Sequence, residues 1–234
     1  MLRPTDFNLL EEHLRGLQTD VGKVLYNPGE HVETVYFPCG PTVVSFLVAS
    51  HDGNFVETML VGKEGAIGGI VSQGNLPAYS RIVVQFGGRF LAMPISRLDE
   101  AKHKSPPLAQ MFARYADCML AQIFQASACN AAHTIEQRTA KWVLAAMDRT
   151  GSTNLPLTQE RLSAMLGVGR SYISRVIKNL KAENILQVRR GRLIVENPDK
   201  LKTKACGCDD MVAEHFNEVF SHMYASESID GAVT

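Results

Sequence analysis

The sequence of 234 residues predicts an α+β protein: a small antiparallel β sandwich or barrel, then a long helix, then a helix-turn-helix followed by a β-hairpin. Three observations support this fold class. Short apolar segments alternate with turn residues between residues 20 and 95, a long helical apolar pattern follows Pro106-Pro107, and residues 155–195 have the pattern of two short helices and a hairpin. The length suits two modest domains.

The first segment has the pattern of an antiparallel sheet. Its turns are rich in glycine, proline and asparagine, as in Asn27-Pro28-Gly29 and His51-Asp52-Gly53-Asn54. Short strands with regularly spaced turns are typical of a sandwich or barrel. The predicted strands are Val24–Tyr26, Val32–Phe37, Val43–Val48, Phe55–Val61, Ile82–Phe86 and Phe90–Met93.

A long helix is predicted over residues 107–133, because Pro106-Pro107 suit a helix start. Its adjacent apolar pairs widen the apolar arc beyond what one contact surface needs: Met111/Phe112, Met119/Leu120 and Ile123/Phe124. We interpret it as a helix that packs both on its own barrel and on a second subunit; the alternative is a helix buried in one core. A second helix is predicted over Thr134–Arg149, ended by Gly151.

Two short helices with a tight turn are predicted between Leu155 and Leu180. Thr158 is placed as the N-cap of the first, and Gly167-Val168-Gly169 ends it. The second helix has Ile173, Val176, Ile177 and Leu180 on one buried stripe. Its opposite face presents cations and hydroxyls that match the donor and acceptor edges of the DNA major groove: Arg170, Ser171, Ser174, Arg175 and Lys178.

The hairpin adds a basic turn to this helix. Ile185–Val188 and Leu193–Val195 flank Arg189-Arg190-Gly191-Arg192, a turn that can lie along a phosphate backbone. The net charge of the whole chain is zero, yet residues 151–201 carry nine basic against four acidic side chains. This concentration favours a nucleic-acid partner over an ordinary solvated face.

Composition also bears on the compartment. The N-terminal residues lack the apolar core of a secretory signal, and no run of eighteen apolar residues suggests a membrane span. Five cysteines, an odd number, favour reduced thiols over a disulfide framework. We therefore expect a cytoplasmic protein without membrane contact.

Together these features resemble the bacterial CRP/FNR family, the regulators related to the cyclic-AMP receptor protein. The resemblance is carried by Leu157–Val168 with Arg170 and Ser174-Arg175, by Tyr26–Glu30 and by Thr134–Trp142. It implies a jelly-roll sensor domain (1–106, like a cyclic-nucleotide-binding domain), a dimerisation helix (107–133), a winged helix-turn-helix (134–201) and a C-terminal extension (202–234). It also implies a homodimer on an inverted-repeat operator, RNA polymerase as a partner, and a guanine contact by Arg175. Gly169 departs from the Ser or Thr usual there, but glycine is an acceptable N-cap.

The resemblance makes cyclic AMP an improbable effector. Cyclic-nucleotide-binding members carry a Gly-Glu-Leu turn, which here reads Gly68-Gly69-Ile70, so the carboxylate is missing. The arginine and the small hydroxyl residue that follow in those members correspond to Arg81 and Ser80. Arg81 is either aligned with that arginine or displaced by one place, and in a strand a displacement of one place points the side chain to the other face. These four residues are the effector-site candidates, while the signal and the choice between activation and repression stay open.

Four residues form a candidate metal or redox site. Cys129 and His133 are spaced to share a helix face, and Cys206 and Cys208 follow the wing. The set suits zinc, an iron–sulfur cluster or a thiol switch, with separate idle cysteines as the favoured alternative because no sequence feature brings the segments together. The cofactor is therefore left open.

Two rival functions and one role for the tail complete the predictions. A cupin-like enzyme is disfavoured, since no His-x-His pair is present; a winged helix used only for protein contacts is the other rival. Met211, Val212, Phe216, Val219, Phe220 and Met223 predict an amphipathic helix over Asp209–Tyr224. It is expected to dock on the same protein, or alternatively to shield the basic helix with its acids.

Overall fold

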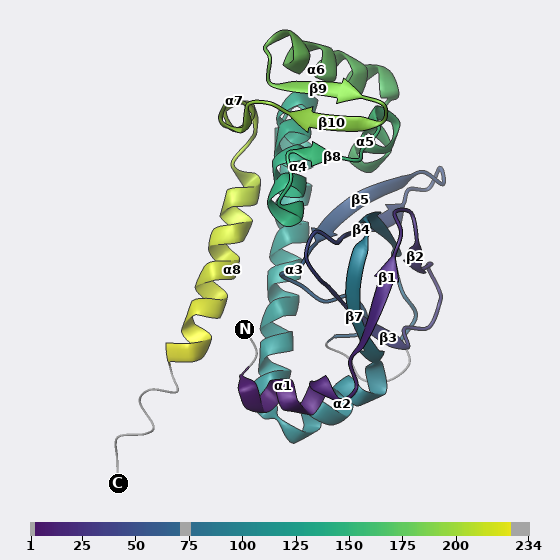
Figure 1. The fold of residues 1–234 in the computed structure, drawn as a ribbon, viewed down its shortest axis with the longest axis vertical. Helices are drawn as coiled ribbons and strands as arrows, with labels where there is room; N and C mark the ends of the chain where they lie inside the picture. The colour runs from purple at the N-terminus through teal and green to yellow at the C-terminus, as the bar shows by residue number, and fades with distance from the viewer. Residues whose placement is uncertain (1–2, 71–75, 226–234) are drawn as a thin grey trace.

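The N-terminal part is a roll of two antiparallel sheets in this computed structural model, which describes residues 3–70 and 76–225 (Figure 1). A first helix, α1 (Pro4–Glu11), precedes it. One sheet has the order β1 (Arg15–Thr19), β7 (Gly88–Pro94), β3 (Thr34–Pro38), and the other β2 (Val24–Tyr26), β6 (Arg81–Phe86), β4 (Val43–Ala49), β5 (Phe55–Val61). The predicted antiparallel jelly roll is confirmed, and all six predicted strands are present.

Besides α1, two elements of this part were not predicted from the sequence pattern. Strand β1 is exposed at Arg15 to Gln18 and buried only at Thr19, so it lacks the alternation of a half-buried strand. Pairing with β7 defines it instead, from Arg15 opposite Ala92 to Thr19 opposite Gly88. Helix α2 (Ile95–Lys104) follows β7 directly and buries Leu98 and Ala101.

The long helix α3 (Pro106–Ala132) forms the spine of the molecule (Figure 1). It begins where Pro106-Pro107 predicted, with the Ser105 side chain accepting a hydrogen bond from the Leu108 amide. Leu108, Phe112 and Tyr115 are buried against the roll. Within the described ranges, no helix combines the length and the apolar composition needed to cross a membrane.

The C-terminal part is a winged helix-turn-helix. After α4 (Ile135–Thr150) come β8 (Asn154–Leu155), α5 (Gln159–Leu166), α6 (Arg170–Ala182), β9 (Leu186–Arg189), β10 (Arg192–Val195) and α7 (Pro198–Lys204). The predicted caps are confirmed: the Thr158 side chain accepts from the Arg161 amide, and Gly151 and Gly167 end their helices in the left-handed conformation that glycine tolerates best. Gly169 caps α6 without a side-chain hydrogen bond.

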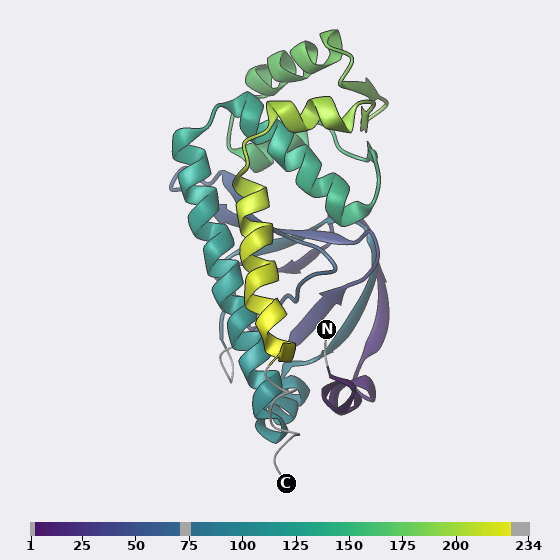
Figure 2. The ribbon, with the colours of Figure 1, turned by 90° about the vertical axis from the view of Figure 1, so that its left-hand side faces the viewer.

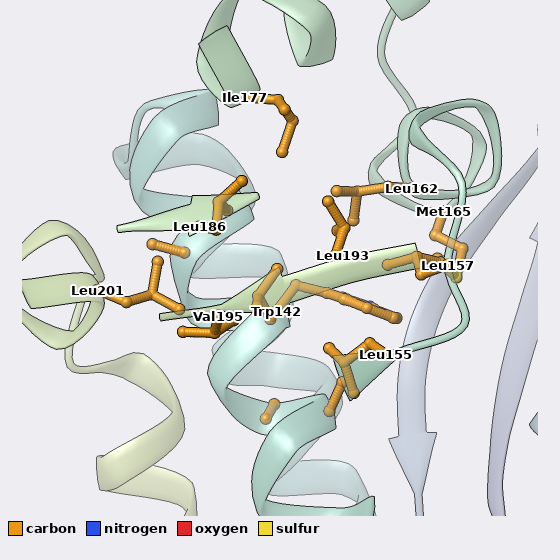
Figure 3. Close-up of a cluster of buried hydrophobic side chains, with 14 of the residues drawn as sticks. Trp142, Leu155, Leu157, Leu162, Met165, Ile177, Leu186, Leu193, Val195 and Leu201 are labelled. Carbon is orange, nitrogen blue, oxygen red and sulfur yellow. The ribbon is translucent and has the colours of Figure 1, made fainter. Parts of the chain in front are cut away.

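The core of this winged part continues into the roll. Figure 3 shows side chains of α4, α5, α6 and the three-stranded sheet converging around Trp142, with Leu201 of α7 closing one side. Val43, Leu60 and Phe86 of the roll belong to the same buried cluster. The two parts therefore share apolar surface, and α6 is held by packing that extends well beyond its own sheet.

The final helix α8 (Cys208–Ala225) lies beside α3 in both views (Figures 1 and 2). The rings of Tyr115 and Phe216 meet edge to face at 6.3 Å, and Arg114 donates to the Val219 carbonyl over 3.3 Å. The predicted amphipathic helix docked on the same protein is confirmed. The alternative of an acidic shield over the basic helix is wrong for this arrangement, because α8 runs away from α6 along α3; the last residues of the predicted extension, 226–234, lie outside the described part.

Candidate nucleic-acid interface

Helix α6 separates its buried and exposed side chains sharply. Ile173, Ile177 and Leu180 are almost fully buried, and Val176 is 7% exposed. On the other side Arg170, Ser171, Arg175 and Lys178 are exposed, and Ser174 is partly buried. The structure thus brings all five predicted residues onto one outward face of one helix, with no acidic residue in its first turn.

Two residues at or beside this face were not predicted, Tyr172 of α6 and Gln159 of α5. Tyr172 is 57% exposed, and the Arg175 guanidinium lies 5.8 Å from the centre of its ring. The Ser174 hydroxyl donates to Oε1 of Gln159, the first residue of α5, over 2.9 Å. Tyr172 could have been found from the helical period, since it falls outside the buried stripe. Gln159 could not, because its place depends on how α5 crosses α6.

The wing has a tighter turn than predicted. Arg189, the last residue of β9, pairs with Arg192, the first residue of β10, and only Arg190 and Gly191 lie between them. Both turn residues have positive φ, 44° and 77°, as a two-residue hairpin of the right twist requires. Arg189 donates to Gln187 and Arg192 to Asn154, while all three arginines remain exposed. Strands β9 and β10 lie at the same end of the molecule as α6 (Figure 1).

The effector-site candidates occupy tightly packed positions. A Cβ atom on Gly68, where φ is 117°, would lie 2.6 Å from the Thr34 carbonyl oxygen, and one on Gly69 would lie 2.4 Å from Ile95. Ser80 is buried, and the Arg81 guanidinium lies 5.5 Å from the centre of the Phe55 ring. The buried Nε of Arg81 has no hydrogen-bond partner among the described residues. Effector binding by this set stays a prediction.

A cavity lies away from these candidates, between the roll, α3 and α8. Its volume is about 680 Å³, and aromatic and aliphatic side chains including Phe37, Phe112 and Phe216 line most of it, with Arg149 and Asp209 among its charged lining residues. None of the four effector-site candidates lines this cavity.

The four candidate metal or redox residues come together. The Cys129 and Cys206 Sγ atoms are 3.6 Å apart, and Cys208 Sγ lies 3.5 Å from Nδ1 of His133. The three thiols are buried, and no disulfide is formed. His133 is not on the helix face that the spacing suggested: α3 ends at Ala132, and His133 is its C-cap in an extended conformation.

The roll and the winged part also meet through Glu57 of β5. Nε1 of Trp142 donates to Oε1 of Glu57 over 2.5 Å, and the Ser45 hydroxyl donates to its other oxygen. Burial raises the pKa of Glu57 to about 7, against the two hydrogen bonds and the nearby Arg149 and Lys141 charges, which favour the carboxylate. This joint between the two parts therefore changes protonation near neutral pH.

The Glu57 joint should weaken as pH rises. A carboxyl group whose pKa is higher in the folded state binds more protons folded than unfolded, so its contribution is lost as pH rises through about 7. Between pH 6 and pH 8 we expect a loss of about 1 kcal/mol, or roughly 2–4 °C in Tm. Glu57→Gln keeps a neutral acceptor for Trp142. In this variant the fall in Tm that Glu57 causes between pH 6 and pH 8 should be absent, as measured by calorimetry.

The control is Glu64→Gln, which alters a carboxylate that binds Arg149 over 2.9 Å at the same joint. It should leave the pH dependence of Tm unchanged. An equal pH dependence in wild type and Glu57→Gln would contradict the assignment.

The winged part matches a known domain. Residues 137–204 match the Crp-like helix-turn-helix domain. No curated protein sequence matches the chain significantly.

Solved structures share the whole fold. A CRP/FNR-family transcriptional regulator from Eubacterium rectale is 15% identical, with a TM-score of 0.67, and the match covers 86% of this chain and 94% of that one. FixK2 from Bradyrhizobium japonicum is 16% identical, with a TM-score of 0.68 and coverage of 82% and 98%. A CRP/FNR-family regulator from Thermus thermophilus is 20% identical, with a TM-score of 0.64 and coverage of 82% and 98%.

The chain thus combines the β-roll and the long helix with a winged domain that matches a Crp-like helix-turn-helix. The chain therefore shares the fold of these CRP/FNR-family structures, and residues 137–204 match the Crp-like helix-turn-helix domain, as the sequence predicted.

Proposed function

We propose that this protein binds an inverted-repeat operator as a homodimer and controls transcription in response to a signal sensed by the roll. The observation that carries the proposal is the outward face of α6, where cations and hydroxyls lie opposite a buried apolar stripe. Because the buried stripe packs α6 against the core, its exposed face can enter the major groove while that packing stays intact.

The side chains of this face are proposed to make two kinds of contact, with base edges and with phosphates. Arg175 lies one turn into α6 and is proposed to bind a guanine edge with both arms of its guanidinium, flanked by the hydroxyls of Ser171 and Ser174. Arg170 and Lys178, with Arg189, Arg190 and Arg192 of the wing, are proposed to bind phosphates. The α6 amino terminus, free of acids, adds the positive end of the helix dipole.

Dimerisation is proposed through α3. Leu120 is 49% exposed and Phe124 is 68% exposed, one turn apart on the helix surface that faces away from the roll. Ala113, Asp117, Ser127 and Ala131 continue the same exposed line at alternating spacings of four and three. That spacing is the seam of a two-stranded coiled coil, and it would place two α6 helices on successive half-sites.

The remaining parts follow from this assignment. We propose the domains 1–106, 107–133, 134–201 and 202–234, although α7 crosses the boundary at 201. Action on DNA implies the cytoplasm and RNA polymerase as a further partner, and a regulatory rather than an enzymatic role.

Salt dependence tests the proposal. If a dimer neutralises 6–10 phosphates, its operator affinity should fall by about 10³–10⁵-fold between 50 and 200 mM salt. Fluorescence anisotropy with duplexes recovered by genomic footprinting measures this slope. Absence of binding to every duplex at low salt, or binding indifferent to salt, would favour the protein-contact winged helix instead.

A further inference from the structure

The cluster of Cys129, His133, Cys206 and Cys208 is built like a metal centre. Its four ligand atoms all lie within 4.8 Å of one another, and three of the four residues are buried. We propose that it binds a single Zn²⁺ ion through three thiolates and the neutral imidazole. This proposal does not depend on DNA binding.

The distances fit one tetrahedral ion. A Zn–S bond of about 2.3 Å makes the edge between two sulfurs of a tetrahedron about 3.8 Å, and the edge between sulfur and nitrogen about 3.6 Å. The Cys129–Cys206 sulfur separation is 3.6 Å, and the Cys208–His133 separation is 3.5 Å. Four protein ligands leave no open position, which is the pattern of a structural rather than a catalytic zinc site.

The same distances disfavour the other occupants. An iron–sulfur cluster places several irons and sulfides between its ligands, which would not fit thiols and imidazole all within 4.8 Å of one another. A disulfide needs a sulfur separation of about 2.0 Å, against 3.6 Å between Cys129 and Cys206. Soft thiolates with one imidazole select zinc over the oxygen-preferring Mg²⁺ and Ca²⁺.

The site lies at the junction between the parts of the molecule. Cys129 is in the last turn of α3, and His133 is in the link to α4, which begins at Ile135. Cys206 lies between α7 and α8, and Cys208 is the first residue of α8. Zinc would thus join the end of the long helix to the segment that follows the wing, and so hold the winged part in a defined orientation.

Zinc binding at this site replaces thiol protons with the metal ion. Each thiol that is protonated in the metal-free protein releases its proton on forming a Zn–S bond, up to three protons per zinc, while neutral His133 donates a lone pair. No oxidation or reduction takes place. Zinc uptake at constant pH should therefore release acid.

The test is metal analysis of the full-length protein purified without chelators under anaerobic conditions. Mass spectrometry of the metals should find about one zinc per chain, and Co²⁺ added to the chelated protein should give a thiolate charge-transfer band. Cys208→Ser and Cys206→Ser should bind zinc at least about 100-fold more weakly, because losing a ligand costs no less than losing an outer-shell partner. Cys39→Ser is the matched control and should leave zinc binding unchanged, since the Cys39 thiol donates to the Phe37 carbonyl and is not one of the four ligands.

Several outcomes would overturn the proposal, and the wild-type protein decides it even if a variant misfolds. They are a metal-free protein that binds neither added zinc nor cobalt, iron with inorganic sulfide in place of zinc, or a Cys129–Cys206 disulfide in place of bound metal in the purified protein. Operator binding is measured separately on the same samples, so failure of the zinc site leaves the DNA-binding proposal standing.

Discussion

Replacing both Leu120 and Phe124 with glutamate is expected to convert the protein to a monomer. The two side chains are 49% and 68% exposed in the single chain, so the change should leave the fold intact. In the proposed dimer four carboxylates would face one another in the apolar seam, where desolvation and like-charge repulsion oppose association. Sedimentation velocity should report half the wild-type mass.

The same double variant should lose at least about 100-fold in operator affinity. A monomer engages one half-site and loses the effective concentration that couples the second contact to the first. Fluorescence anisotropy on the full operator and on an isolated half-site separates this loss from damage to α6, because half-site binding should be unchanged.

The matched control is Leu17→Glu with Val21→Glu. These apolar side chains are 41% and 44% exposed on the roll, so the variant carries the same added charge away from α3. It should remain dimeric. Persistence of the dimer in the α3 variant, or dissociation in the control, would refute α3 as the dimer interface.

The helices of the DNA-binding part could be predicted because the residues within each helix determine which side is buried and where the helix begins and ends. Helix α6 has four apolar residues at helical spacing, and all four are buried as predicted. The caps at Thr158 and Gly151 depend on the chemistry of one or two residues, so their positions also followed from the sequence. Strand β1 was missed since its pairing with β7 spans most of the roll and leaves no local pattern.

The contacts between segments could not be predicted in the same way. Cys129 and Cys206 are 77 residues apart, and their meeting depends on how α7 and α8 return to the end of α3. Glu57 and Trp142 are 85 residues apart, so neither the joint nor the raised pKa of Glu57 has a signal in either segment. Residue types indicated possible chemistry at the cysteines, whereas tertiary packing decided which of them share a site.

The last prediction concerns Arg175, whose replacement by alanine should weaken operator binding by about 10–100-fold and relax the choice of one base pair in each half-site. The guanidinium is exposed and contacts the Tyr172 ring, so the folded chain should lose little stability. Its proposed bidentate bond to a guanine accounts for the loss of discrimination, since alanine has no side-chain donor for the guanine edge. Anisotropy against operators substituted at each position measures the change.

Lys178→Ala provides the contrast on the same exposed face of α6. Loss of a phosphate contact should weaken binding by a similar factor on every sequence and lower the salt slope by about one, with the base preference intact. A guanine contact by Arg175 requires the two variants to differ in this way: one changes which sequence is bound, and the other changes only how tightly. If Arg175→Ala kept the wild-type base preference, α6 would be bound to the backbone alone, and sequence recognition would have to come from the wing or from Gln159 and Tyr172.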